Sequence, residues 1–296
     1  MPPAHVALAI LCTVIWGFNF VVIKWALLDY PPLLLTALRF VLASLPFLPF
    51  VRPPRAKWYW VVGVGLFLGV GQFGFLFTGM SLGMPAGLSS AVLQTQVFFT
   101  VMMAIALLGE RPRWQSLVGM ALAFSGVAVI AGHLGAVPPL PFVLVILGAV
   151  SWAVSNIITR KAASPDAFAL IVWASAVAPL PLLALSWAIE GQGRILAAFA
   201  APSWSGLGSL CYLAFASTNI AYGVWSFLLK KYPAAAVAPF TLMVPFWGIG
   251  SSAFLLGERL EAEKLIGAAL IVAGVAANSW PGKRIKENTG AESVID

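Results

Sequence analysis

The chain is built of long apolar runs separated by short breaks that contain proline, glycine or charged residues. A membrane-spanning helix needs about 20 consecutive, mostly apolar residues. Ten runs reach or approach that length, and none shows the strict alternation typical of a strand, so each predicts a helix. The expected spans are 5–28, 31–51, 58–80, 85–108, 114–132, 140–159, 167–188, 204–229, 234–256 and 262–280.

Composition agrees with this pattern. Hydrophobic residues make up 61% of the 296 residues and charged residues 9%, and the mean hydropathy is +0.96. Soluble domains carry about 25% charged residues, so the low charge indicates a protein embedded in a lipid bilayer. Together with the helical runs, it predicts an all-α, multi-pass membrane protein. The net charge of +7 does not indicate nucleic-acid binding, because no basic helix or basic-aromatic stripe is present.

The basic residues predict the orientation of the chain. With the N-terminus inside, twelve Lys and Arg fall on the inner side and three on the outer side, while Lys24 and Arg39 lie deeper within spans. Cytoplasmic loops carry the excess of positive charge, so both termini are expected in the cytoplasm.

An internal repeat divides the chain into halves. The stretches "LLGERPRWQSLVGMALAFSGVAVI" from Leu107 and "LLGERLEAEKLIGAALIVAGVAAN" from Leu255 are identical at twelve of 24 positions, at an offset of 148 residues. We expect repeats at 1–136 and 137–282 and a polar cytoplasmic tail at 283–296. Each repeat holds five spans, and because five is odd the second repeat must be inverted in the membrane. Inverted repeats around a midplane site are typical of secondary transporters that work by alternating access.

The chain also resembles a known family over nearly its whole length. The resemblance rests on "VIWGFNFVVIK" in the first span, "LRF" in the second, "GMPAGLSSAVLQTQVFFT" leading into the fourth, and "LLGER" after the fourth and ninth. These motifs are similar to those of the EamA-type drug/metabolite transporters, and within them to the bacterial amino-acid exporters.

The resemblance implies a ten-helix exporter of the bacterial inner membrane, with two inverted five-helix repeats around a central cavity. Its implied substrates are neutral or zwitterionic amino acids, including aromatic ones. Export of cysteine or O-acetylserine-type metabolites, or of another small solute, is left open. We expect a monomer, with a dimer also left open.

Ionisable residues are informative by their absence. No Asp or Glu lies mid-span, and His5 and His133 lie at span ends. A proton-coupled pump usually has such a relay inside the bundle, so we hypothesise export driven by the substrate gradient, or coupling through groups that the sequence does not identify. The missing carboxylates also argue against a carrier of cationic drugs.

A few charged and proline residues are candidates for gating. Arg39 and Lys24 either extend toward polar surroundings or act on a substrate carboxylate or gate. Glu110 and Glu258 end the fourth and ninth helices at matched positions and predict gate or helix-end contacts. Pro239 and Pro245 lie inside the ninth span, whereas the fourth has no internal proline, so a bend is expected in the ninth alone.

Polar and aromatic side chains at mid-depth are the candidates for substrate binding. A buried amide must find a partner, either on another helix or on a ligand in a cavity, and aromatic rings would suit an apolar side chain. The candidates are Trp16, Asn19, Gln72, Phe73, Phe77, Gln94, Phe98, Trp152, Asn156, Tyr222 and Phe246.

Several other functions are excluded. The stretch "GVGQFGF" from Gly69 has the spacing of a dinucleotide-binding turn, but no strand precedes it, so we interpret Gly65 and Gly69 as a packing seam between helices. Cys12 and Cys211 lie in apolar runs without metal-ligand spacing, so no metal or cofactor is expected. No nucleophile with a base, filter loop or charged ring is visible, which argues against an enzyme or a channel.

Overall fold

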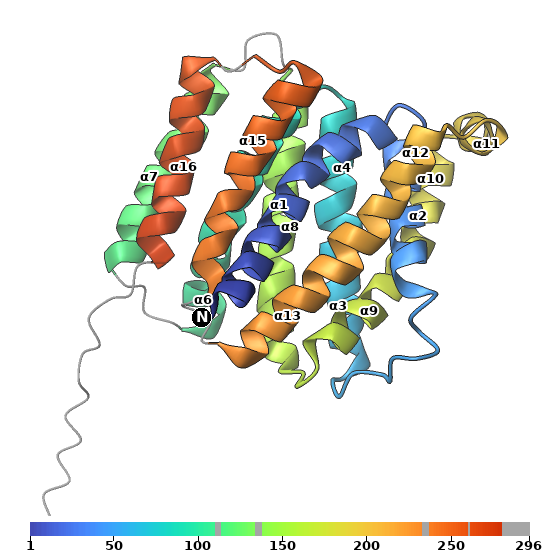
Figure 1. Ribbon diagram of the computed structural model, residues 1–296, viewed down its shortest axis with the longest axis horizontal. Helices are drawn as coiled ribbons and strands as arrows, with labels where there is room; N and C mark the ends of the chain where they lie inside the picture. The colour runs from blue at the N-terminus through green and yellow to red at the C-terminus, as the bar shows by residue number, and fades with distance from the viewer. Residues whose placement is uncertain (110–113, 134–137, 233–236, 260, 280–296) are drawn as a thin grey trace, which may run out of the picture.

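The computed structural model describes residues 1–109, 114–133, 138–232, 237–259 and 261–279. All regular structure in these ranges is helical, and the helices lie side by side in one bundle (Figure 1). Seven helices of this described part are long and apolar enough to cross a membrane, and Pro32–Ser44 and Phe240–Leu256 are shorter apolar helices. The prediction of an all-α, multi-pass membrane protein is confirmed.

Each predicted span is occupied by helix, although several spans are interrupted. The first repeat contains α1 (Pro3–Ala26), α2 (Pro32–Ser44), α3 (Trp58–Val64), η1 (Gly65–Phe73), α4 (Gly74–Ser81), α5 (Ala86–Val92), η2 (Leu93–Thr95), α6 (Gln96–Leu108) and α7 (Trp114–Gly132). The second contains α8 (Pro139–Ala162), α9 (Ala167–Val177), α10 (Pro179–Ile189), α11 (Gln192–Ala200), α12 (Trp204–Cys211), η3 (Tyr212–Ile220), α13 (Ala221–Lys231), η4 (Ala238–Leu242), α15 (Met243–Leu256) and α16 (Ala262–Ser279).

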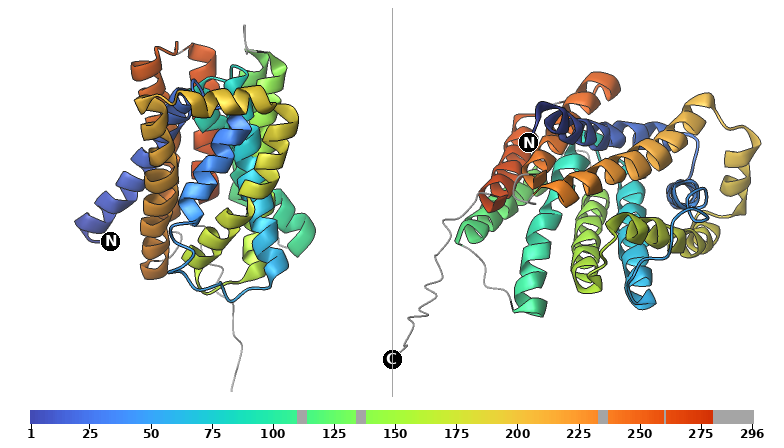
Figure 2. Two further views of the ribbon diagram at one scale, coloured as in Figure 1. Left: turned by 90° about the vertical axis from the view of Figure 1, so that its right-hand side faces the viewer. Right: turned by 60° about the horizontal axis from the view of Figure 1, so that its bottom comes forward.

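One boundary differs from the sequence prediction, and one short helix was not predicted. The second helix ends at Ser44 rather than near 51, because Pro46 and Pro49 follow and proline both lacks a donor and restricts the residue before it. The short helix α11 was not predicted. It packs Ile195 and Ala198 inward while Leu196 and Phe199 stay exposed, and Figure 2 shows it lying crosswise to the long helices.

The third and eighth spans each contain a π-helical segment in the middle, η1 and η3. At the 148-residue offset of the repeat, these segments coincide to within one residue. In each segment a side-chain hydroxyl bonds a backbone carbonyl. Ser151 of α8 donates to the carbonyl of Phe67 in η1, and Thr218 donates to the carbonyl of Leu213, five residues earlier in η3. Such segments are rare and occur frequently at functional sites.

The bend expected in the ninth helix alone stays a prediction, but the two halves differ less here than the prolines indicate. A 3₁₀ turn interrupts the α-helix in both repeats: η2 in the fourth predicted span and η4 in the ninth. Pro239 lies in the first turn of η4 and Pro245 in the first turn of α15. Both prolines therefore lie close to points where one helical segment gives way to the next.

The glycine seam lies against α9 and α10. A Cβ atom on Gly65 would be 2.5 Å from the carbonyl oxygen of Ala174, and one on Gly69 would be 2.4 Å from the Cβ atom of Ala178. Such contacts let two helix backbones approach closely.

Gly69→Ala should therefore destabilise the bundle by about 1–3 kcal/mol, because the added methyl group overpacks the contact with Ala178. Thermal unfolding of the purified protein in detergent measures the change. Gly193→Ala in α11 is the control, since a Cβ there meets no atom within 4 Å. Equal midpoints for the two variants would contradict the seam.

Candidate functional site

A cavity of ≈ 270 Å³ lies in the interior of the bundle, lined by residues from both repeats. Pockets for drug-sized ligands measure about 300–1,000 Å³, so this cavity suits a smaller molecule. Its lining is Trp16, Asn19, Phe20, Arg39, Gln72, Phe73, Leu76, Ser90, Leu93, Gln94, Gln96, Trp152, Asn156, Ser217, Tyr222, Trp225, Thr241 and Val244.

Arg39 of α2 is the cation of this lining, and its side chain is held from three directions. Its Nε atom donates to Thr218 Oγ1 at 3.1 Å and its Nη2 atom to Ser217 Oγ at 3.5 Å, while the guanidinium carbon lies 4.0 Å from the centroid of the Phe73 ring. The residue is 1% exposed and its Nη1 atom has no partner. Across the described ranges no carboxylate forms an ion pair with it.

Amide side chains occupy other parts of the wall. Asn19 of α1 and Gln72 of η1 are both buried, and their side-chain oxygens are unpaired. Gln94 donates from Nε2 to the carbonyl of Thr241 at 3.0 Å, which links the two 3₁₀ segments. Asn156 of α8 donates from Nδ2 to Gln96 Oε1 at 2.9 Å.

Aromatic rings form an apolar surface beside these amides. The Trp16 ring lies 5.2 Å from both the Tyr222 and the Trp225 rings, measured between centroids. Its indole N–H donates to the carbonyl of Ser217 at 3.1 Å, so the ring is fixed in place. Trp152 of α8 also lines the cavity.

Three predicted residues do not line the cavity. Phe77 is fully buried one turn beyond Phe73, and Phe98 packs with Ala123 and Val275 in a separate cluster. Phe246 is 68% exposed, so the prediction that it faces a cavity is wrong. It lies two residues from Val244, which does line the cavity, and such residues point to nearly opposite sides of a helix.

Comparison with protein families decides the family. The model of the EamA-like transporter family matches residues 4–132 and again residues 140–280. The chain belongs to the EamA-like transporter family.

Two curated relatives of this chain carry the same name. A "Probable amino-acid metabolite efflux pump" of Escherichia coli (strain K12) is 40% identical over 278 residues, 92% of this chain and 93% of that protein. The protein of the same name in Salmonella typhimurium (strain LT2) is 42% identical over 286 residues, 94% and 95% of the two chains. A protein of known crystal structure superimposes with a TM-score of 0.63 at 20% identity, over 94% of this chain and 99% of the other, which shows a shared fold.

Two other predicted charges of this EamA protein, Lys24 and Glu258, do not line the cavity. Lys24 donates from Nζ to the carbonyl of Met80 at 2.7 Å, which ties α1 to the end of α4. Glu258 accepts hydrogen bonds from the backbone N–H groups of Ala86, at 2.6 Å, and Gly87, at 3.0 Å, at the start of α5. Glu110 lies outside the described residues.

A second helix cap was missed in the sequence. Glu190 is 6% exposed and accepts from the backbone N–H groups of Leu33, at 2.7 Å, and Leu34, at 3.1 Å, at the start of α2. Both α2 and α5 follow a proline and have no capping side chain of their own. That missing local cap is the signal in the sequence, because the first N–H groups of a helix need an acceptor from elsewhere.

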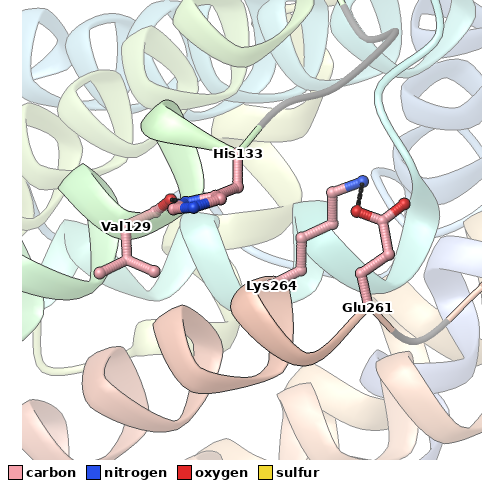
Figure 3. Close-up of polar contacts among 4 residues, drawn as sticks. All are labelled: Val129, His133, Glu261 and Lys264. Carbon is pink, nitrogen blue, oxygen red and sulfur yellow. Dashed lines mark hydrogen bonds and ion pairs between the residues drawn. The ribbon is translucent and has the colours of Figure 1, made fainter.

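The polar contacts in Figure 3 also lie outside the cavity. The His133 ring bonds the carbonyl of Val129, one turn back on α7, at 2.8 Å, and Lys264 pairs with Glu261 at 2.8 Å. The first contact satisfies a carbonyl in the last turn of α7, and the second is an ion pair at the start of α16.

Ser90, Ser217 and Thr241 were not among the predicted site residues although they line the cavity. Small hydroxyl residues are as common at helix contacts as in binding sites, so the sequence alone does not single them out.

Gln72→Leu should leave the fold intact and reduce transport about tenfold, because we expect the unpaired buried amide of Gln72 to bond the transported solute. Exchange in proteoliposomes and thermal unfolding measure the two effects. Thr13→Val is the control, because Thr13 is buried, bonds Ile10 of its own helix and does not line the cavity. Unchanged exchange in well-folded Gln72→Leu would remove Gln72 from the site.

Proposed function

We propose that this protein exports amino acids and closely related small metabolites across the bacterial inner membrane, with the central cavity as the substrate site. The observation that carries the proposal is Arg39, a buried cation with no described carboxylate partner in a cavity that also offers amides and aromatic rings. A carboxylate-bearing solute supplies the missing charge. The names of the two relatives support the same substrate class.

The proposed architecture has ten membrane spans in two inverted repeats, 1–136 and 137–282, with both termini in the cytoplasm. Two successive matches to one family model support the division, and so do the paired π segments η1 and η3 and the paired 3₁₀ turns η2 and η4. The distribution of Lys and Arg supports the orientation. Transport then proceeds by alternating access, as one repeat moves against the other around the cavity.

In this arrangement Glu190 and Glu258 lie on the outer side and join the two repeats. Each carboxylate belongs to the second repeat and holds the start of a helix in the first. We assign them to the outer gate, which these contacts keep closed. Lys24 is assigned to the same region, because it holds the end of α4 beside that gate.

Transport is proposed to run down the substrate gradient without a carboxylate relay. The cavity lining contains no Asp, Glu or His among the described residues. The aromatic surface of Trp16, Trp152 and Trp225 accepts apolar side chains of different size, so the range of amino acids is broad. Cysteine and O-acetylserine-type metabolites fit the same cavity and form the second substrate candidate.

Counterflow in proteoliposomes tests the function. Vesicles loaded with unlabelled phenylalanine, threonine, methionine or O-acetylserine should take up the same labelled solute through the purified protein, and choline, a cation without a carboxylate, should not enter. Collapse of an imposed proton gradient should leave the rate unchanged. Absence of exchange with every member of the panel would contradict the proposal.

A further inference from the structure

Three polar side chains of the cavity keep atoms without a partner. Arg39 has a free Nη1 donor, Asn19 a free Oδ1 acceptor and Gln72 a free Oε1 acceptor. Their residues are 1%, 5% and 2% exposed, and all three line the same cavity. Buried polar atoms are normally paired because leaving them unpaired destabilises the protein, so three such atoms in one cavity indicate a ligand that pairs with them.

The chemical types of the three atoms define that ligand. A carboxylate offers only acceptors and therefore suits the guanidinium, whereas an ammonium group offers three donors and suits the two amide oxygens. A zwitterionic α-amino acid carries both groups on adjacent atoms. We propose that Arg39 binds the carboxylate and that Asn19 and Gln72 together bind the ammonium group of one α-amino acid, a subsite that rests on the proposed transport function.

The surroundings of Arg39 hold its guanidinium for this role. Thr218 and Ser217 accept hydrogen bonds from Nε and Nη2, and the Phe73 ring lies against the guanidinium carbon, so Nη1 is the nitrogen left without a partner. The side chain is immobilised before the substrate arrives, which lowers the entropy lost on binding. Its positive charge also disfavours amines that lack a carboxylate.

The subsite separates two kinds of recognition. The head group common to all α-amino acids is bound by Arg39, Asn19 and Gln72, while the variable side chain meets the aromatic surface that includes Trp16. Transport is therefore strict for the free carboxylate and free ammonium group and tolerant of the side chain.

A competition series tests the subsite. Counterflow of labelled L-phenylalanine and, in parallel, of L-methionine is measured against four competitors of each: the amino acid, its amide, its N-acetyl derivative and its decarboxylated amine. Each modified competitor should be at least about tenfold weaker than the amino acid, because it loses a hydrogen bond to a charged group. Equal competition by the amide and the amino acid would overturn the assignment of Arg39, and equal competition by the N-acetyl derivative would overturn that of Asn19 and Gln72.

Variants test which protein side chain binds the carboxylate of the amino acid and which binds its ammonium group. Arg39→Met should abolish discrimination against the amide but keep it against the N-acetyl derivative. Asn19→Leu and Gln72→Leu should give the reverse, and Thr36→Val, a buried change on α2 outside the cavity, should behave like the wild type. If Arg39→Met exchanges too slowly to measure, the wild-type series decides.

Failure of the transport proposal is distinct from failure of the subsite. No wild-type counterflow with either amino acid would overturn the proposed function and the subsite with it. Normal wild-type counterflow in which the amide and the N-acetyl derivative compete as strongly as the free amino acid would overturn the subsite alone.

Discussion

Arg39→Met is expected to reduce amino-acid exchange by about 10- to 100-fold while the protein stays as stable as the wild type or becomes more stable. The guanidinium is buried and no described carboxylate balances it, so its removal relieves a desolvation penalty. Methionine can fill a similar path against the Phe73 ring. Replacing buried ionic groups by apolar ones is often neutral or stabilising by about 1–4 kcal/mol.

Exchange in proteoliposomes and the thermal unfolding midpoint of the same preparation measure this pair of effects. Thr36→Val, on the same helix, controls for a change in a buried polar residue that does not reach the cavity. If Arg39→Met loses exchange and stability together, Arg39 holds the fold and its role as a binding residue is contradicted.

Glu190→Ala is expected to destabilise the protein by about 2–4 kcal/mol, because the N–H groups of Leu33 and Leu34 lose their acceptor in a buried place. Glu190→Gln should cost less, because it keeps one carbonyl acceptor but loses the charge that interacts favourably with the start of α2. The exposed Glu263→Ala in α16 is the matched control, with an expected change below about 1 kcal/mol. Thermal or denaturant unfolding gives all three values.

The Glu190→Gln variant also tests the proposed outer gate. Glu190→Gln should increase labelling of a cysteine placed at Ser90, in the cavity wall, by a membrane-impermeant maleimide added from outside, in a background without Cys12 and Cys211. Reduced stability without any change in labelling would mean that Glu190 caps α2 but does not gate the cavity.

The sequence predicts the helices and the polar residues of the cavity well for one physical reason. In an apolar span any amide or cation is conspicuous, because it must be paired or face a cavity. Asn19, Arg39, Gln72, Gln94 and Asn156 were identified in this way, and the structure places all five around one cavity. The predictions of their roles in binding remain to be tested.

Three features lay beyond sequence reasoning. The π segments and the 3₁₀ turns change the angle between successive side chains, which a constant helical period does not capture. Depth along a span also does not say which way a side chain faces, and Phe246 lies at mid-depth but is exposed. The Glu190 cap joins residues more than 150 positions apart, a contact that depends on how the repeats pack. The halves also proved more alike than the prolines suggested, because the fourth span has a 3₁₀ turn without any proline.

Equilibrium binding to the purified protein tests the central claim most directly, namely that the cavity around Arg39 holds the transported amino acid. Labelled phenylalanine and methionine should bind the wild type at one molecule per chain, with the amides at least about tenfold weaker. Arg39→Met should bind the amino acid and its amide equally weakly, while Thr36→Val binds like the wild type. Unchanged affinity of a folded Arg39→Met variant for the free amino acid would contradict the account.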